Sequence, residues 1–331
     1  MDAVKSIVLG IVQGLTEFLP VSSSGHLVII PFLFKWDYIP VYYTVTLHLA
    51  TLLSLVTIFH RDIWQIIKAF FLGIVKKSKR SEKYFKLSIF IIIATIPAAV
   101  IGFLFNDFIG GFFSKPHYTG IFLLLTAVFL VTGEATGKRA ESRIKYKNNH
   151  NMTNNTGSNE NTGSNENSGN NNNVTSNGNK ANDKKSKPIN KADGTKNSEY
   201  RGLNFISATV VGIGQAISIL PGISRSGTTI SFARSFGINR QESVKFSMIL
   251  SIPVILGAFI FETLKSYSNI FQADLKIAGN IAVSFLCSYL SGIFAIKFLM
   301  VISKNKNLNF FAIYCIVIGI TIITLVLIKK F

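Results

Sequence analysis

Apolar residues gather in long runs along this chain. Six runs are long enough to cross a hydrocarbon core of roughly 30 Å as helices rising about 1.5 Å per residue. They lie near residues 41–59, 85–105, 118–136, 244–261, 277–300 and 309–328. The stretch from Ile313 to Ile328 carries no charged side chain, whereas a surface helix of a soluble protein has a polar face. The pattern therefore predicts an all-α integral membrane protein with six transmembrane helices.

A shorter apolar segment, residues 62–75, follows the first of these runs. Asp62, Gln65 and Lys68 recur every three residues among its apolar residues, which makes the segment amphipathic. An amphipathic helix of this length is typical of the membrane interface. We therefore expect residues 62–75 to lie at the membrane interface.

Two further apolar segments, residues 5–34 and 203–236, are broken in the middle. Proline, glycine and a cluster of serines interrupt each one. Non-helical backbone at membrane depth is tolerated only where protein or a watery cavity satisfies its polar groups. We therefore interpret each segment as a re-entrant helix pair.

The two broken segments repeat one another at an offset of 202 residues. This offset places Gly10–Gln13 on Gly212–Gln215, and Ser22–Gly25 on Ser224–Gly227. Each half of the chain then contains one re-entrant pair and three spans, and an odd number of spans inverts the second half. The sequence predicts an inverted-topology repeat, with halves at residues 1–136 and 202–331.

Between the halves lies a polar insert, residues 137–201, which is dominated by asparagine over 148–182. Such a composition buries too little apolar surface to order itself, so we expect a disordered linker. Loop 60–84 and both flanks of the linker are rich in lysine and arginine, while loop 106–117 contains only Lys115. The excess of positive charge predicts a multi-pass protein of the plasma membrane, with the linker cytoplasmic and both termini external.

The net charge of +18 comes from 34 lysines and arginines against 16 acidic residues. In a soluble protein this charge would suggest nucleic acid as a partner. Here the basic residues lie in loops between apolar runs, so we expect contact with anionic membrane lipids and no nucleic acid. The two cysteines, Cys287 and Cys315, lie inside apolar runs and provide neither a disulfide framework nor zinc-binding spacing.

The first broken segment contains a polar helix face followed by a serine turn. Gln13 and Glu17 are four residues apart and share a face, and Pro20 then discourages continuation of the helix. The turn offers hydroxyls and free N–H groups where a second helix begins, with Ser23 or Ser24 as its cap. A helix N-terminus of this kind attracts phosphate.

The second broken segment repeats this turn and adds a guanidinium, Arg225, which binds phosphate oxygens in a bidentate manner. Two such turns facing each other would hold a diphosphate. The candidate binding residues in the two turns and the adjoining helices are Gln13, Ser22, Ser24, Gly25, Ser224, Ser226, Gly227 and Thr229.

Charged side chains inside a membrane cost roughly 2.5–3.5 kcal/mol each on insertion scales. Glu17, His26 and Arg225 are therefore expected to face a polar interior. Two simpler interpretations stay open: a structural ion pair between Glu17 and Arg225, and a hydrogen-bonded interior role for His26. For His48 we favour packing in the core over an approach to the site, and we expect Arg234 either to line the site or to extend towards the interface.

The motifs QGLTEFLPVSSSGH (13–26) and LPGISRSGTT (220–229) resemble those of the undecaprenyl-diphosphate phosphatase family, the bacitracin-resistance type. The resemblance covers the spans but not the asparagine-rich insert. It implies hydrolysis of an isoprenyl diphosphate lipid to its monophosphate, which recycles the carrier for cell-envelope glycans. Bacitracin sequesters the diphosphate, hence the link to resistance. Many members carry glutamate where this chain has Gln13, which cannot act as a base.

The resemblance implies four catalytic residues: Glu17, Ser23, His26 and Arg225. We expect Glu17 to hold a divalent cation, Mg²⁺ or Ca²⁺, or to activate the attacking group. Ser23 is the candidate nucleophile, with His26 as its proton acceptor or donor, and direct attack by water is left open. A homodimer is left open as well. The alternative function is a lipid-phosphate or small-anion transporter, because secondary transporters share this plan of repeats.

Overall fold

The computed structural model describes residues 2–157 and 200–328, apart from Tyr38, Ser114, Arg201 and residues 266–274. The chain divides into two compact units. One unit comprises Met1–Glu141 with Tyr200–Phe331, and the other is Ser142–Glu199. Of the predicted linker, 137–201, residues 137–157 are helical, and residues 158–199 and 201 lie outside the described residues.

All regular elements within the described ranges are helices, as predicted. Besides a short 3-10 helix at Lys77–Ser81, they are α1 (Ala3–Phe18), α2 (Ser23–Phe34), α3 (Val41–Val75), α4 (Lys83–Leu104), α5 (Asn106–Phe113), α6 (Pro116–Gly157), α7 (Phe205–Ile217), α8 (Arg225–Ser235), α9 (Arg240–Lys265), α11 (Leu275–Asn305) and α12 (Asn309–Ile328).

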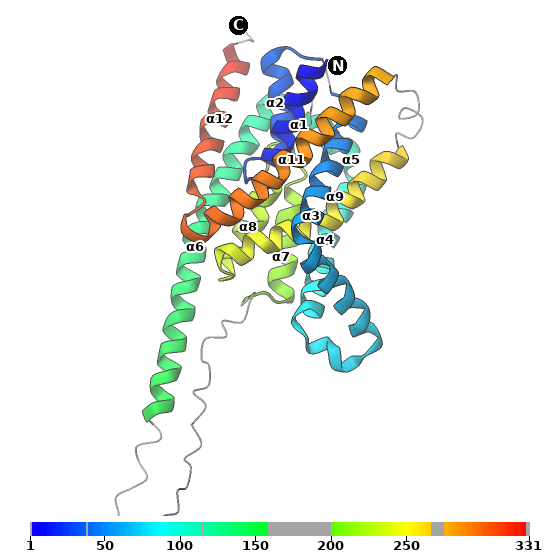
Figure 1. The fold of residues 1–331 in the computed structure, drawn as a ribbon. Helices are drawn as coiled ribbons and strands as arrows, with labels where there is room; N and C mark the ends of the chain where they lie inside the picture. The colour runs from blue at the N-terminus through cyan, green and yellow to red at the C-terminus, as the bar shows by residue number, and fades with distance from the viewer. Residues whose placement is uncertain are drawn as a thin grey trace, which may run out of the picture. The chain divides into compact units, whose positions relative to one another are not determined.

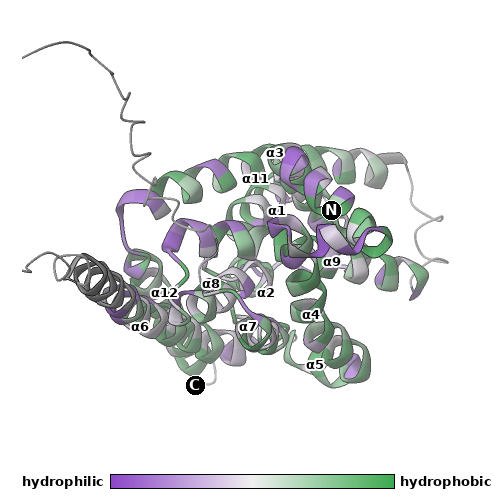
Figure 2. Cartoon of the chain, turned by 90° about the horizontal axis from the view of Figure 1, so that it is seen from below, coloured by the Kyte–Doolittle hydropathy of each residue, from purple (hydrophilic) through white to green (hydrophobic). Residues whose placement is uncertain are grey.

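Six of these helices, α3, α4, α6, α9, α11 and α12, are long and apolar enough to cross a membrane. This confirms the six predicted spans. Large apolar side chains such as Phe103 and Ile313 are more than half exposed on these helices. Figure 2 shows long hydrophobic stretches along the helices of the body, which suits a lipid environment.

The interfacial placement of residues 62–75 stays a prediction. These residues continue α3 beyond a local break at Phe59, where φ is −105° and ψ is 17°. One helix therefore contains both the predicted span and the amphipathic segment. The break falls where the first predicted span, residues 41–59, ends.

The two broken segments form helix–turn–helix pairs, α1–α2 and α7–α8 (Figure 1). Their turns, which we call the first tip (residues 19–25) and the second tip (residues 218–227), contact each other. The Ser226 hydroxyl donates to the Leu19 carbonyl at 3.2 Å, and an ion pair joins Arg225 to Glu17. The packing therefore brings together two turns that are about 200 residues apart in the sequence.

Glycines allow close packing of the first helix of each pair. A Cβ at Gly14 of α1 would lie 2.4 Å from the Ser288 carbonyl oxygen of α11, and one at Gly212 of α7 would lie 2.6 Å from the Ala94 carbonyl oxygen of α4. Helix α1 of the first half thus packs on the second half, and α7 of the second half packs on the first. Two halves related by a two-fold axis would exchange partners in this way. The inverted repeat stays a prediction, which these pairings favour.

Candidate active site

The carboxylate of Glu17, at the end of α1, is the centre of the site. Its Oε2 accepts hydrogen bonds from Gln13 Nε2 at 2.9 Å and from Ser23 Oγ at 2.6 Å. Its Oε1 accepts from Arg225 at 2.5 Å, across the contact between the two tips. The Glu17 side chain is 4% exposed and that of Arg225 is 16% exposed. Helix geometry explains the bond to Gln13, four residues away, whereas the contact with Arg225 requires the fold.

Serines cap the helices that begin at the two tips. The Ser22 hydroxyl accepts a hydrogen bond from the Gly25 N–H at 3.2 Å, and the Ser224 hydroxyl accepts from the Gly227 N–H at 3.1 Å. Two helix N-termini, each with a partial positive charge, therefore point towards the same region. That arrangement favours an anion between them.

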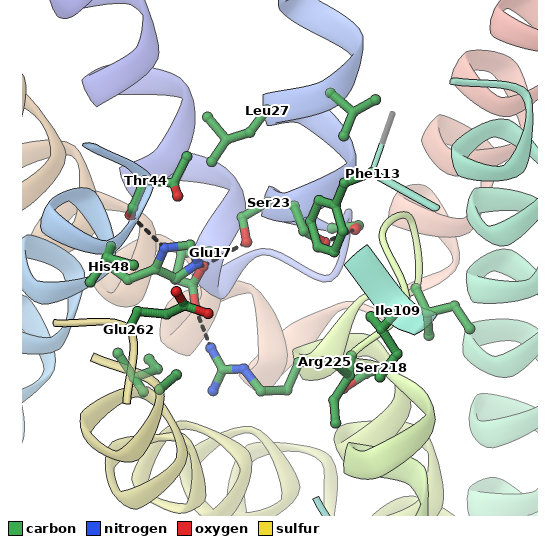
Figure 3. Close-up of a pocket in the computed structure, with 18 of the residues that line it drawn as sticks. Glu17, Ser23, Leu27, Thr44, His48, Ile109, Phe113, Ser218, Arg225 and Glu262 are labelled. Carbon is green, nitrogen blue, oxygen red and sulfur yellow. Dashed lines mark hydrogen bonds and ion pairs between the residues drawn. The ribbon is translucent and has the colours of Figure 1, made fainter. Parts of the chain in front are cut away.

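A cavity of about 950 Å³ opens beside this centre. Figure 3 shows that Ser23, His48 and Arg225 converge on Glu17, which lies at the polar end of the cavity. Much of the remaining wall is apolar and includes Leu27, Val28, Ile109, Phe113, Val254, Ile255 and Phe259. A small charged centre within a largely apolar cavity suits an amphiphilic ligand that carries a negative head group.

The predicted binding residues fall into two groups. Ser22, Ser23, Ser24, Ser224 and Arg225 belong to the cavity wall together with Glu17. The others lie behind it, among the supporting contacts: Gln13, Gly25, Ser226, Gly227 and Thr229. The Thr229 hydroxyl, for example, pairs with that of Ser247 at 2.6 Å.

His26 lies behind the first tip and is buried. Its Nδ1 is 2.7 Å from the Ser22 carbonyl oxygen, and its Nε2 is 2.7 Å from the Tyr314 hydroxyl. The Ser23 hydroxyl donates to Glu17 and not to this ring. The geometry therefore matches the hydrogen-bonded interior histidine that the sequence left open.

His48 is the residue that sequence reasoning undervalued. It was expected to pack in the core, but its side chain is 32% exposed on the cavity wall, with Nε2 at 3.6 Å from Glu17 Oε2. Glu262 of α9 lines the same cavity, and the sequence patterns above did not single it out. The available signal was a titratable residue within an apolar run, which marks a functional candidate.

Arg234 neither lines the site nor extends towards the interface, so both expectations for it were wrong. It is 1% exposed and pairs with Glu134 and Glu141 of α6, while Glu134 also pairs with Arg240. The network joins α8 to α6 and α9. The guanidinium therefore helps to fix the helix that carries Arg225.

The side chains around Glu17 include possible ligands for a divalent cation. Within the described ranges, no group of three or more histidine, cysteine and acidic side chains is arranged to hold a metal ion. The Gln13 Oε1 atom, however, is buried and has no hydrogen-bond partner. Mg²⁺ is commonly bound through one or two protein ligands together with phosphate oxygens of the substrate. Glu17 and Gln13 fit a cation of that kind.

The sequence is similar to that of known proteins along nearly its whole length. The family model described as "Bacitracin resistance protein BacA" matches residues 6–157 and 180–321. The undecaprenyl-diphosphatase of Alkaliphilus metalliredigens is 34% identical over 98% of both chains. That of Methanococcus vannielii is 32% identical over 96% of this chain and 98% of its own, and that of Thermosipho africanus is 33% identical over 95% and 96%. The chain belongs to the BacA family.

Proposed function

We propose that this membrane protein hydrolyses undecaprenyl diphosphate to the monophosphate and inorganic phosphate. This reaction recycles the lipid carrier for cell-envelope glycan synthesis and confers resistance to bacitracin. The named activity of the relatives supports the proposal. The observation that carries it is the convergence of Ser23 and Arg225 on the buried Glu17 at the polar end of a largely apolar cavity.

In the proposed mechanism, Arg225 and the N-termini of α2 and α8 bind the diphosphate and offset the charge that develops during transfer. Glu17 accepts the proton of the Ser23 hydroxyl, which already donates to it at 2.6 Å. Ser23 Oγ then attacks the terminal phosphorus, the bond from that phosphorus to the bridging oxygen breaks, and the isoprenyl monophosphate leaves with the electron pair. Water next attacks the phosphoserine, Ser23 Oγ takes back its proton from Glu17, and inorganic phosphate leaves. If water attacks directly, Glu17 accepts the proton of that water instead.

A divalent cation, Mg²⁺ or Ca²⁺, is part of the proposal. Glu17 and the unpartnered amide oxygen of Gln13 would hold it beside the diphosphate. When bound, it would neutralise phosphate charge as a Lewis acid. Because Gln13 stands where a second carboxylate is common in the family, it contributes one negative charge fewer to such a site.

The proposed orientation has the cavity open to the outside of the plasma membrane. Residues 106–117, predicted to be external from their low positive charge, contribute Asn106, Asp107 and Pro116 to its wall. The linker would be cytoplasmic and both termini external. A cysteine placed at Asp107 and labelled in intact cells by a membrane-impermeant maleimide tests this orientation.

A transporter of lipid phosphates or small anions is the second candidate. The opposed helix–turn–helix pairs favour it, because such pairs occur at the substrate sites of secondary transporters. A transporter needs anion-binding groups but no nucleophile. The Ser23 hydroxyl bonded to a carboxylate favours the hydrolase. The homodimer stays a prediction.

The decisive experiment is phosphate release from undecaprenyl diphosphate by the detergent-purified protein. We expect release with Mg²⁺ or Ca²⁺, loss in EDTA and loss in Arg225→Ala. Release that persists in EDTA would remove the cation from the proposal and leave hydrolysis intact. No release from folded protein under any condition would favour the transporter.

A further inference from the structure

The last spanning helix of each half contacts the tip of the other half. In α6, from the first half, the Thr126 hydroxyl donates to the Gly222 carbonyl at 3.0 Å and accepts from the Ser224 N–H at 2.9 Å. In α12, from the second half, the Tyr314 hydroxyl is 2.7 Å from Nε2 of His26, which lies in the helix that follows the first tip. Thr126 therefore holds the second tip directly, whereas Tyr314 reaches the first tip through a histidine.

His26 connects Tyr314 to the backbone of the first tip. Its Nδ1 is 2.7 Å from the Ser22 carbonyl oxygen, and a carbonyl can only accept, so Nδ1 carries a proton. The backbone N–H of His26 donates to the same oxygen at 3.2 Å. Nε2 can pair with the Tyr314 hydroxyl in either charge state of the ring, because a phenol both donates and accepts. The imidazole therefore bridges α12 and Ser22.

Ser22 is a residue whose conformation needs such support. Its φ of 69° lies in the left-handed region, which is costly for a serine. The side chain of His26 holds its carbonyl, and its hydroxyl caps α2 by accepting from the Gly25 N–H at 3.2 Å. Ser23 follows directly in the chain. The backbone angles of Ser22 therefore determine how the Ser23 hydroxyl approaches Glu17, to which it donates at 2.6 Å.

Tyr314 is placed by a helix that packs on both the first tip and α6. The thiol of its neighbour Cys315 is fully buried and lies 3.7 Å from the Pro20 carbonyl oxygen of the first tip. One turn further along α12, a Cβ at Gly319 would lie 2.8 Å from the Gly120 carbonyl oxygen of α6. The phenol and imidazole rings are nearly parallel, at 11°. The Tyr314 hydroxyl is therefore presented to His26 from a closely packed helix.

We propose that Tyr314 and His26 are positioning residues of the reaction. They hold Ser22 in its left-handed conformation and thereby direct the Ser23 hydroxyl towards Glu17 and the bound diphosphate. This inference rests on the proposed hydrolase function. The family resemblance implies a catalytic role for His26, but here both of its ring nitrogens lie within hydrogen-bond distance of protein groups. The two roles differ in what they require of the ring, since positioning needs a donor to Ser22 and proton transfer needs a titrating group.

The first test compares Tyr314→Phe with Tyr289→Phe. Tyr314→Phe removes one hydroxyl and keeps the ring. We expect kcat for undecaprenyl diphosphate to fall roughly fivefold, the equivalent of one neutral hydrogen bond. KM should stay unchanged, because the position of Ser23 matters only in the chemical steps. Tyr289→Phe is the matched control, since its hydroxyl contacts Thr57 of α3 at 3.2 Å, and its kcat should equal that of the wild type.

The second test compares His26→Asn with His26→Ala. An asparagine side chain can donate to the Ser22 carbonyl, as Nδ1 does, but it cannot transfer a proton. We expect His26→Asn to keep kcat within about tenfold of the wild type, whereas His26→Ala should lower it by roughly 10²-fold, as misplacement of a reacting group by about 1 Å can do. Adding Tyr314→Phe to His26→Asn should cause no further loss, because the phenol then has no ring nitrogen to bond.

Thermal melting in detergent establishes that the variants fold. Equal kcat values for folded His26→Asn and His26→Ala, whether high or low, would overturn the positioning role of His26. Equal kcat values for Tyr314→Phe and Tyr289→Phe would overturn that of Tyr314. Either result would leave the hydrolase function in place. Absence of phosphate release by the wild-type protein would overturn the function itself.

Discussion

The first and second tips begin their helices in the same way but carry different chemistry. In each, a serine caps the helix by accepting from the glycine N–H three residues later, at 3.2 Å for Ser22 and 3.1 Å for Ser224. The residue after the cap is Ser23 in the first tip and Arg225 in the second, and each is the first residue of its helix. The same backbone position therefore presents a hydroxyl from one side and a guanidinium from the other.

The backbones of the tips also differ. Ser22 has a φ of 69°, a region that L-residues rarely adopt, whereas its counterpart Ser224 has a φ of −77°. In the second tip the positive φ falls on Gly222, at 110°. Strain at a non-glycine residue tends to mark functional positions. We therefore propose that the first tip is shaped to place a reacting hydroxyl, and the second to place a guanidinium.

Removing the hydroxyl of the first tip should have the largest effect. We expect Ser23→Ala to lower kcat by at least about 10³-fold, with little change in substrate affinity, because a nucleophile acts only in the chemical steps. Phosphate release from purified protein measures this effect. Ser218→Ala is the control, since Ser218 lines the same cavity but donates to the Gln215 carbonyl. Full activity in Ser23→Ala would leave water as the attacking group.

Removing the guanidinium of Arg225 in the second tip should have the next largest effect. Arg225→Ala should lower kcat/KM by about 10²–10³-fold, because it removes charge stabilisation at the transferring phosphate. Arg225→Lys should recover part of this loss, since it keeps the charge but not the bidentate fork. Equal kcat/KM values for Arg225→Lys and Arg225→Ala would mean that a positive charge at this position does not contribute to the reaction.

The same variant should affect folding, because Arg225 neutralises the buried Glu17. Breaking a buried ion pair costs about 3–5 kcal/mol, and Arg225→Ala should therefore lower the melting temperature in detergent. The double variant Glu17→Gln/Arg225→Ala should regain much of that stability while staying inactive. A double variant no more stable than Arg225→Ala would argue against the ion pair as the cause.

Much of this arrangement could be predicted from local patterns. Run length alone indicates six spans, because a hydrocarbon core requires about 20 apolar residues per helix. The serine and glycine clusters marked both tips, since helix caps are encoded by residues within one turn. The kink at Phe59 falls where the first predicted span, residues 41–59, ends, but the continuation of α3 through it could not be predicted from run length.

The composition of the site was harder to predict than its location. His48 lies 31 residues from Glu17 in the sequence and joins the site only through the packing of α3 beside α1. His26 follows Ser23 closely in the motif, yet helix geometry turns its ring towards Tyr314. Proximity in the motif therefore did not bring the ring of His26 to Ser23, whereas His48, distant in the sequence, lies beside Glu17.

A backbone change at the second tip should affect stability more than chemistry. Gly222→Ala places a Cβ 2.5 Å from the Thr119 carbonyl oxygen at a φ of 110°. We expect a loss of about 1–3 kcal/mol, measured as a lower melting temperature in detergent. Gly257→Ala is the matched control, because a Cβ there meets nothing within 4 Å and alanine favours the helix. Equal melting temperatures for the two variants would show that the second tip adapts its backbone freely.

The smallest effect concerns the hydrogen bond between the tips. The Ser226 hydroxyl donates to the Leu19 carbonyl at 3.2 Å, whereas its counterpart Ser24 has only a 3.4 Å contact with Ser22, inside its own tip. A neutral hydrogen bond contributes about 1 kcal/mol, so Ser226→Ala should lower the melting temperature by a few degrees, and Ser24→Ala by less. If this hydrogen bond also positions Arg225 beside Glu17, Ser226→Ala should raise the KM for undecaprenyl diphosphate as well. Equal effects of the two substitutions on stability and KM would mean that the ion pair alone holds the tips together.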